Sequence, residues 1–193
     1  MSPLQQFFLA AGIIGVVAFI MATTPFLQIV FGQPKIGFAF DHDDSKGDGR
    51  VIRIRLANFP VTNRLLKALK VSRLTATGLH LAVQVFNAST GEVVANSFMP
   101  EIGLVPSDRV RAVDLPPSIV MKNAVLAKWQ RATSSAVLFA NRVMPLQEGT
   151  YIVGIRIELG GKIKIVAEPI LHVGKTETEM MWDDVTTNKI FFM

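Results

Sequence analysis

The stretch TYIVGIRIELGGKIKIVAEPILHV, residues 150–173, decides the fold class of this protein. Over 151–159 apolar side chains alternate with small or charged ones, which is the period of a β-strand with one buried face. Gly160 and Gly161 follow, and glycine tolerates the positive φ angles that a two-residue hairpin turn requires. The alternation resumes over 162–166. The stretch therefore predicts a β-hairpin.

Two earlier stretches show the same period. VIRIRLANF (51–59) alternates isoleucine and leucine with arginine. LHLAVQVFNASTGEVVAN (79–96) has the pattern of a strand, a polar turn containing Gly91, and a return strand. Several short alternating strands separated by turn residues predict a mainly β protein, built as an antiparallel β-sandwich.

The segment that leads into the hairpin, PLQEGTY (145–151), resembles the corner before the penultimate strand of immunoglobulin-like sandwiches, where a tyrosine hydroxyl caps a turn. The resemblance covers this short segment and the hairpin after it. The paired cysteines and buried tryptophan of true immunoglobulin domains are missing. The resemblance therefore implies an immunoglobulin-like sandwich and nothing about activity.

One segment between the strands has a helical period instead. Met121, Val125 and Trp129 recur every four residues, opposite polar side chains. This spacing predicts one short helix from Ser118 to Arg131, with Trp129 anchored in the core.

The N-terminal region contains an uncharged segment at residues 7–31, FFLAAGIIGVVAFIMATTPFLQIVF. Twenty-five residues at about 1.5 Å each exceed the roughly 30 Å hydrocarbon core of a bilayer, so the segment predicts a single transmembrane helix. A cleaved signal peptide is the alternative, with a weak cleavage site at Val30-Phe31-Gly32. Its apolar region usually spans only about 7–15 residues behind a basic start. No lysine or arginine precedes this segment, so a retained anchor is favoured.

Small side chains share one face of this predicted helix, where they would let another helix approach closely. The partner would be another membrane subunit or a second copy of the chain. The predicted helix-packing residues are Ala11, Gly15, Ala18 and Ala22.

Composition limits the chemistry of the remaining chain. The protein has 193 residues, a net charge of +5 and no cysteine, so disulfides, thiolate nucleophiles and cysteine-ligated metals are excluded. We expect residues 1–33 to form the N-terminal segment and anchor. Residues 34–174 would form the sandwich, and 175–193 a tail or last strand.

The side of the membrane is less constrained. Lys35, Lys46 and Arg50 follow the anchor while no charged side chain precedes it, and the positive-inside rule then favours a cytoplasmic domain. Long domains, however, translocate largely regardless of charge, and four aspartates lie in the same flank. Anchored β-sandwich domains are more often extracytoplasmic, and we slightly favour that side.

An acidic stretch, DHDDSKGDG (41–49), has the composition of a metal site. In an EF-hand loop starting at Asp41, the sixth position needs glycine and the twelfth glutamate, but Lys46 and Ile52 stand there. An irregular calcium site would use Asp41, Asp43 and Asp48, and His42 could ligate a transition metal. Aspartate, serine and glycine are also ordinary turn formers, so a turn between two neighbouring strands is the favoured interpretation.

No enzymatic motif is present. The histidines His42, His80 and His172 lack the spacing of a metal-binding motif, and there is no nucleophile elbow, phosphate-binding loop or dinucleotide-binding loop. We therefore expect no enzyme activity and no cofactor.

The chain between Arg50 and Arg73 is basic, with no acidic residue. Within it, NRLLKALK (63–70) has the pattern of a short amphipathic turn of helix. Such a basic patch near an anchor would bind a lipid bilayer or an acidic subunit. Nucleic acid is not expected, because aromatic residues beyond Phe59 are missing from the run. The predicted patch comprises Arg50, Arg53, Arg55, Arg64, Lys67, Lys70 and Arg73.

The C-terminal region carries exposed-looking apolar residues in an acidic context. Methionine and tryptophan are enriched in interface cores, which favours a partner contact at 180–182. The last residues would either add a strand to the sandwich or insert into a partner. The candidates are Met180, Met181, Trp182, Phe191 and Phe192.

These features together predict a non-enzymatic single-pass membrane protein. It would act as an accessory or structural subunit of a larger membrane-associated assembly. A membrane-anchored domain that binds a ligand, calcium or copper is the alternative.

Overall fold

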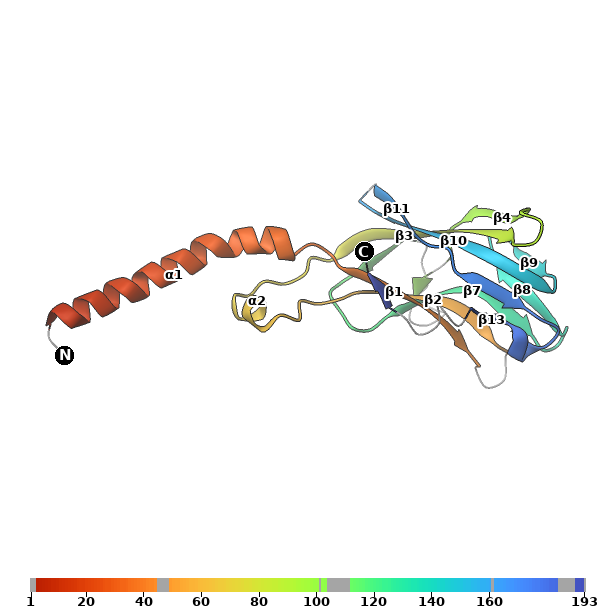
Figure 1. The fold of residues 1–193 in the computed structure, drawn as a ribbon, viewed down its shortest axis with the longest axis horizontal. Coiled ribbons are helices and arrows are strands. Elements are labelled where there is room, and N and C mark those ends of the chain that lie inside the picture. Colours follow the sequence, from red (N-terminus) through yellow and green to blue (C-terminus); the bar gives the residue numbers. More distant parts are fainter. Residues whose placement is uncertain are drawn as a thin grey trace.

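A computed structural model describes residues 3–44, 49–100, 102–103, 112–160, 162–183 and 190–192 of the chain. It begins with one long helix, α1 (Pro3–Phe31), which extends away from one end of a β-domain (Figure 1). The window Phe8–Phe31 of α1 has 24 residues and is long and apolar enough to cross a membrane. No part of this window is buried against the rest of the protein.

The β-domain consists of two layers of antiparallel strands, and in the described part of the chain each layer has seven strands. The first sheet has the order β14 (Ile190–Phe192), β1 (Ile36–Asp43), β2 (Val51–Asn58), β7 (Lys122–Gln130), β8 (Ser135–Phe139), β9 (Val143–Leu146), with β5 (Ile102–Gly103) also paired to β7. The second has the order β13 (Met181–Trp182), β12 (Ile170–Val173), β10 (Gly149–Leu159), β3 (Ala76–Asn87), β4 (Val93–Phe98), with β11 (Lys162–Ala167) on β10 and β6 (Ala112–Leu115) on β3. The predicted β-sandwich arrangement is confirmed.

The core lies between the inner faces of the two sheets. In β2, Ile54 and Leu56 are completely buried, while Arg53 and Arg55 between them are partly exposed on the other face. Alternation along β10 buries its apolar residues in the same way. Each fully buried side chain of this size contributes about 1.5–3 kcal/mol relative to an exposed one, so the period-2 pattern fixes which face of each strand points inward.

The hairpin predicted from residues 150–173 is confirmed. Strands β10 and β11 pair antiparallel, and Leu159 is opposite Lys162 across a turn in which Gly160 has a φ angle of +59°. The corner before β10 also has the expected bond, because the Tyr151 hydroxyl donates to the Gln147 carbonyl at 2.8 Å. Burial of this ring raises the pKa of the Tyr151 hydroxyl.

The predicted helix from Ser118 to Arg131 is wrong, because residues 122–130 form β7, which pairs with β2, β5 and β8. The register between β2 and β7 shifts by one residue, and this bulge buries two successive residues, Leu126 and Ala127. A spacing of four residues is also a multiple of two, so the recurrence of Met121, Val125 and Trp129 fits a strand as well as a helix. Trp129 is nevertheless buried, as predicted.

The one other α-helix in the described residues is α2 (Arg64–Ala68), inside the stretch 63–70 whose pattern is that of a helical turn. In Figure 1 it lies beside the end of α1 that leads into the sandwich. A single 3₁₀ turn (Glu177–Glu179) precedes β13.

Candidate functional site

The candidate site is the junction between the C-terminal end of α1 and the sandwich. Between β2 and β3 the chain makes an excursion, residues 59–75, which we call the α2 excursion. Asn63 caps the short helix inside it, because its side-chain oxygen accepts from the amides of Leu65 and Leu66 at 2.9 and 3.2 Å. This cap satisfies amides that would otherwise lack partners and favours a helical turn in so short a segment.

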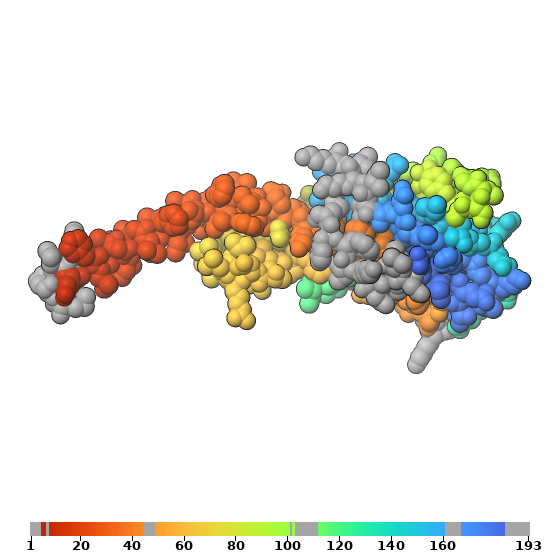
Figure 2. Space-filling model, in the orientation of Figure 1, coloured from red at the N-terminus to blue at the C-terminus, as the bar shows by residue number. Residues whose placement is uncertain are grey.

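The α2 excursion lies against the end of α1 (Figure 2), and hydrogen bonds join the two segments. The Gln28 carboxamide donates to the Ser72 carbonyl at 2.7 Å and accepts from the Ser72 amide at 3.0 Å. The Leu74 amide donates to the Gly32 carbonyl at 2.6 Å. These bonds join residues more than 40 positions apart and fix the end of the helix against the domain.

Arg73 caps the same end of α1. Its guanidinium donates to the carbonyls of Phe31 and Gln33 at 2.6 and 2.9 Å. The last carbonyls of a helix have no partner within the helix and carry the negative end of its dipole, so a cation there is favourable. Arg73 therefore joins the α2 excursion to the C-terminal end of α1.

Asn58 holds the sandwich side of the junction. This completely buried side chain accepts from the Lys35 amide at 3.0 Å and donates to the carbonyls of Leu74 and Leu115 at 2.7 and 3.0 Å. One carboxamide thus connects the linker after α1, the α2 excursion and the end of β6. Sequence reasoning missed Asn58, because an asparagine at the end of an alternating strand has no distinguishing pattern.

The structure divides the residues of the predicted basic patch into arginines paired within the sandwich and cations in the α2 excursion. Arg53 contacts Asp41 and Asp43 at 2.9 and 2.8 Å, and Arg55 contacts Asp41 at 3.3 Å. Both arginines lie on the outer face of β2, where Arg53 is directly opposite Asp41 of β1 and Arg55 is opposite Ala39, diagonal to Asp41. Their positive charges are paired with carboxylates of the same sheet.

Arg50 is buried and belongs to neither a surface nor a patch. Its guanidinium contacts Asp44 at 2.6 Å and donates to the Thr178 and Met180 carbonyls at 2.7 and 3.3 Å. The hydrogen bond from Arg50 lowers the pKa of the Asp44 carboxyl below its ordinary value. Arg50 therefore ties the end of β1 to the segment before β13.

The second group of cations lies in the α2 excursion. Arg64, Lys67 and Lys70 are exposed and form no ion pair with residues that the structure describes. These three side chains, with Arg73 beside them, are the part of the predicted patch that the fold brings to the end of α1.

The acidic stretch 41–49 begins in β1 and leads to the paired strand β2. Asp41 and Asp43 lie in β1 and face arginines, as described, and Asp48 lies outside the described residues. Among the residues that the structure describes, no group of three or more histidines or carboxylates is arranged to hold a metal ion. The interpretation as a connection between neighbouring strands is confirmed for β1 and β2, which pair antiparallel.

The partner contact predicted at 180–182 needs correction. Met180 and Trp182 are 0% and 1% exposed, and Trp182 packs against Phe40 with ring centroids 5.2 Å apart. These side chains complete the core, so they are not available to a partner; Met181 between them is partly exposed. Phe191 and Phe192 belong to β14, whose backbone pairs with β1, and their side chains lie outside the description.

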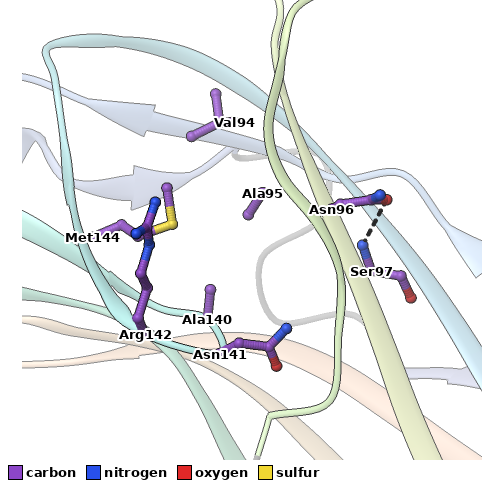
Figure 3. Close-up of a pocket in the computed structure, with 8 residues that line it drawn as sticks. All are labelled: Val94, Ala95, Asn96, Ser97, Ala140, Asn141, Arg142 and Met144. Carbon is purple, nitrogen blue, oxygen red and sulfur yellow. Dashed lines mark hydrogen bonds between the residues drawn. The ribbon is translucent and has the colours of Figure 1, made fainter.

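A cleft of about 600 Å³ opens between β4 and the turn joining β8 to β9 (Figure 3). Its lining includes Asn96, Ser97, Asn141 and Arg142 beside small and apolar residues. Arg142 is the one titratable group among the eight lining residues, and a guanidinium stays charged. The cleft therefore offers no pair of acid and base for proton transfer.

The predicted helix-packing face of α1 is open. Ala11, Gly15, Ala18 and Ala22 are exposed, and no atom lies near the position that a Cβ on Gly15 would take. A shallow apolar hollow lies over Gly12 on an adjoining face, between Phe8 and Val16. Neither face is covered by the described part of the chain.

No protein-family model, curated protein or solved structure matches this chain.

Proposed function

We propose that this protein is a non-enzymatic single-pass membrane protein, and that its anchored sandwich is an accessory or structural subunit of a larger membrane-associated assembly. The observation that carries the proposal is that a 24-residue, predominantly apolar window of α1 is not covered by the described part of the chain and is joined to a folded domain. An apolar surface of that size requires lipid or other helices around it.

The junction supports a retained anchor over a cleaved signal peptide. Cleavage after Gly32 would remove Gln28, the partner of Ser72, and the Phe31 carbonyl that Arg73 caps. A signal peptide has no reason to form such bonds with the mature domain. Intact-mass measurement of the membrane-extracted protein tests this: 21.2 kDa is expected, and loss of the first 32 residues would contradict it.

We place the helix–helix contact on the small-residue face, since close packing replaces the hydrophobic drive for association within lipid. The Gly15→Leu, Ala18→Leu double variant fills that face. Ile13→Leu, Ile20→Leu is the matched control, because at 100° per residue both positions lie on the opposite side of α1.

The experiment is the native mass of the mildly solubilised protein, with mass spectrometry of the components. A stoichiometric complex that the Gly15→Leu, Ala18→Leu variant dissociates and the control preserves is expected. A monomer in the wild type would contradict the subunit proposal. A homodimer without other components would mean that the helix–helix contact is made with a second copy of this chain.

We infer further that the sandwich is immunoglobulin-like and that it lies on the extracytoplasmic side of the cell membrane. The Tyr151–Gln147 corner supports the first inference. The general behaviour of anchored sandwiches supports the second, whereas the cations beside the end of α1 count toward the cytoplasm. Protease protection in sealed right-side-out membranes distinguishes the two sides, and a protected sandwich would reverse the orientation.

A further inference from the structure

We infer that the anchor-side end of the sandwich binds anionic lipid headgroups, through the α2 excursion and the loop between β6 and β7, residues 116–121. The inference rests on the proposed membrane-spanning role of α1. It assigns a second, peripheral membrane contact to the folded domain itself.

The depth of the α2 excursion is set by its bonds to α1. Residues rise about 1.5 Å each along an α-helix, so about 20 residues cross the roughly 30 Å hydrocarbon core. Counted from Phe8, where the apolar window begins, that distance ends at Gln28. Gln28 is bonded to Ser72, and the excursion therefore lies at the boundary between hydrocarbon and headgroups.

The charge of this end suits an anionic surface. Arg64, Lys67 and Lys70 project from one short helix and the turn after it, and no acidic residue occurs between Arg50 and Arg73. Each cation close to an anionic leaflet strengthens binding about fivefold. Arg50, Arg53 and Arg55 are engaged within the sandwich, whereas Arg64, Lys67 and Lys70 have no carboxylate partner among the residues that the structure describes.

Exposed apolar side chains gather at the same end. Leu65 in α2 is 68% exposed and Ile119 in the 116–121 loop is 75% exposed, and Leu74 and Val120 in the same two segments are exposed as well. The loop belongs to this end because the Ser118 amide donates to the Asn58 carbonyl at 2.7 Å. Such side chains are unfavourable in water and favourable in the interfacial region of a bilayer. Cations and apolar tips together form the pattern of a membrane-surface contact.

Lipid is the favoured occupant over an acidic protein because α1 itself brings this surface to the bilayer. No further component is needed to cover it. An acidic subunit remains an outcome that the experiment below can detect.

The test uses single-cysteine labelling of the full chain in lipid nanodiscs, which is direct because the protein has no cysteine. Leu65→Cys and Ile119→Cys carry an environment-sensitive fluorophore at the inferred contact. Val93→Cys is the control, since Val93 is also exposed but follows the turn at the opposite end of β3. Val16→Cys, in α1, reports whether the anchor itself is inserted.

In nanodiscs containing anionic phosphatidylglycerol, the labels at 65 and 119 should emit at shorter wavelength and be quenched by lipid-attached nitroxides. The label at 93 should remain accessible to an aqueous quencher. Replacing Arg64, Lys67 and Lys70 by glutamine should reduce the quenching at 65 to its level in purely zwitterionic nanodiscs; Arg142→Gln, at the distant cleft, should not.

The two proposals fail differently. A lipid-quenched label at 16 with water-exposed labels at 65 and 119 would overturn the headgroup contact and leave the anchor intact. A label at 16 that stays in water would overturn the anchor. Protection of 65 and 119 in native membranes but not in pure-lipid nanodiscs would assign the surface to a protein partner and overturn the lipid contact. If Leu65→Cys fails to fold, Val120→Cys provides a second position.

Discussion

The Asn58 carboxamide offers the sharpest test of how the junction is held together. Asn58→Ala removes one acceptor and two donors from a completely buried position. The Lys35 amide and the carbonyls of Leu74 and Leu115 then lose their partner together.

The magnitude follows from the burial of those three groups. The bond to Leu115 is buried, and an orphaned buried acceptor costs about 1–3 kcal/mol. The bonds to Lys35 and Leu74 are only partly buried, so water can replace part of each, at a cost of about 0.5–1 kcal/mol per bond. We expect the free energy of unfolding to fall by about 2–5 kcal/mol, out of the roughly 5–15 kcal/mol typical of a whole domain.

Tryptophan fluorescence during urea unfolding of the full chain in mild detergent measures this change. Both tryptophans, Trp129 and Trp182, are buried in the sandwich, so the signal reports on that domain and not on α1. Asn141→Ala is the control, because Asn141 is exposed and a surface change of this kind stays within about 0.5 kcal/mol. If Asn58→Ala destabilises the sandwich no more than the control does, Asn58 does not hold the junction and the reasoning is refuted.

Three further expectations concern the sandwich. Tyr151→Phe keeps the buried ring but loses the bond to Gln147, and should lower the free energy of unfolding by about 1 kcal/mol in the same titration; an unchanged midpoint would contradict this. Arg50 lowers the pKa of Asp44, so the unfolded state binds more protons and stability should be lost as the pH falls below about 4, the ordinary range of an aspartate. The Asp44→Asn variant should lose less over that window, by a small amount because Asp44 is 57% exposed, and an identical profile would count against the pair. Calcium or copper should leave the melting temperature unchanged, whereas a rise that Asp43→Ala abolishes would support a metal site.

The strands whose alternation is uninterrupted could be predicted from the sequence. Buried and less buried residues alternate over 151–157 in β10 and over 51–56 in β2, and the local pattern determines these side-chain directions. The turn at Gly160 adds a local conformational requirement that only a few residues satisfy. These elements depend on neighbours in sequence, which is why sequence reasoning reaches them.

The elements that were missed depend on contacts between distant parts of the chain. Strand β7 pairs with β2, β5 and β8, and its four-residue apolar spacing does not by itself distinguish a strand from a helix. In the sequence, Trp182 has the pattern of an interface residue in an acidic tail, but in the structure its ring packs in the core against Phe40. Asn58 acquires its role only when residues 35, 74 and 115 converge on it. None of these contacts can be predicted from the pattern of neighbouring residues in the sequence.

The distribution of charge shows that the role of the basic residues depends on where the fold places them. The run from Arg50 to Arg73 is uniformly basic in sequence, yet β2 pairs with β1, and the aspartates there neutralise one half of the run. The other half leaves the sheet in the α2 excursion, where the described residues provide no compensating acids. The cations without described partners are thereby concentrated at the end of α1, together with the exposed apolar side chains of Leu65 and Ile119. Two independent properties, charge and apolar exposure, coincide at the depth that the length of the helix assigns to a bilayer surface.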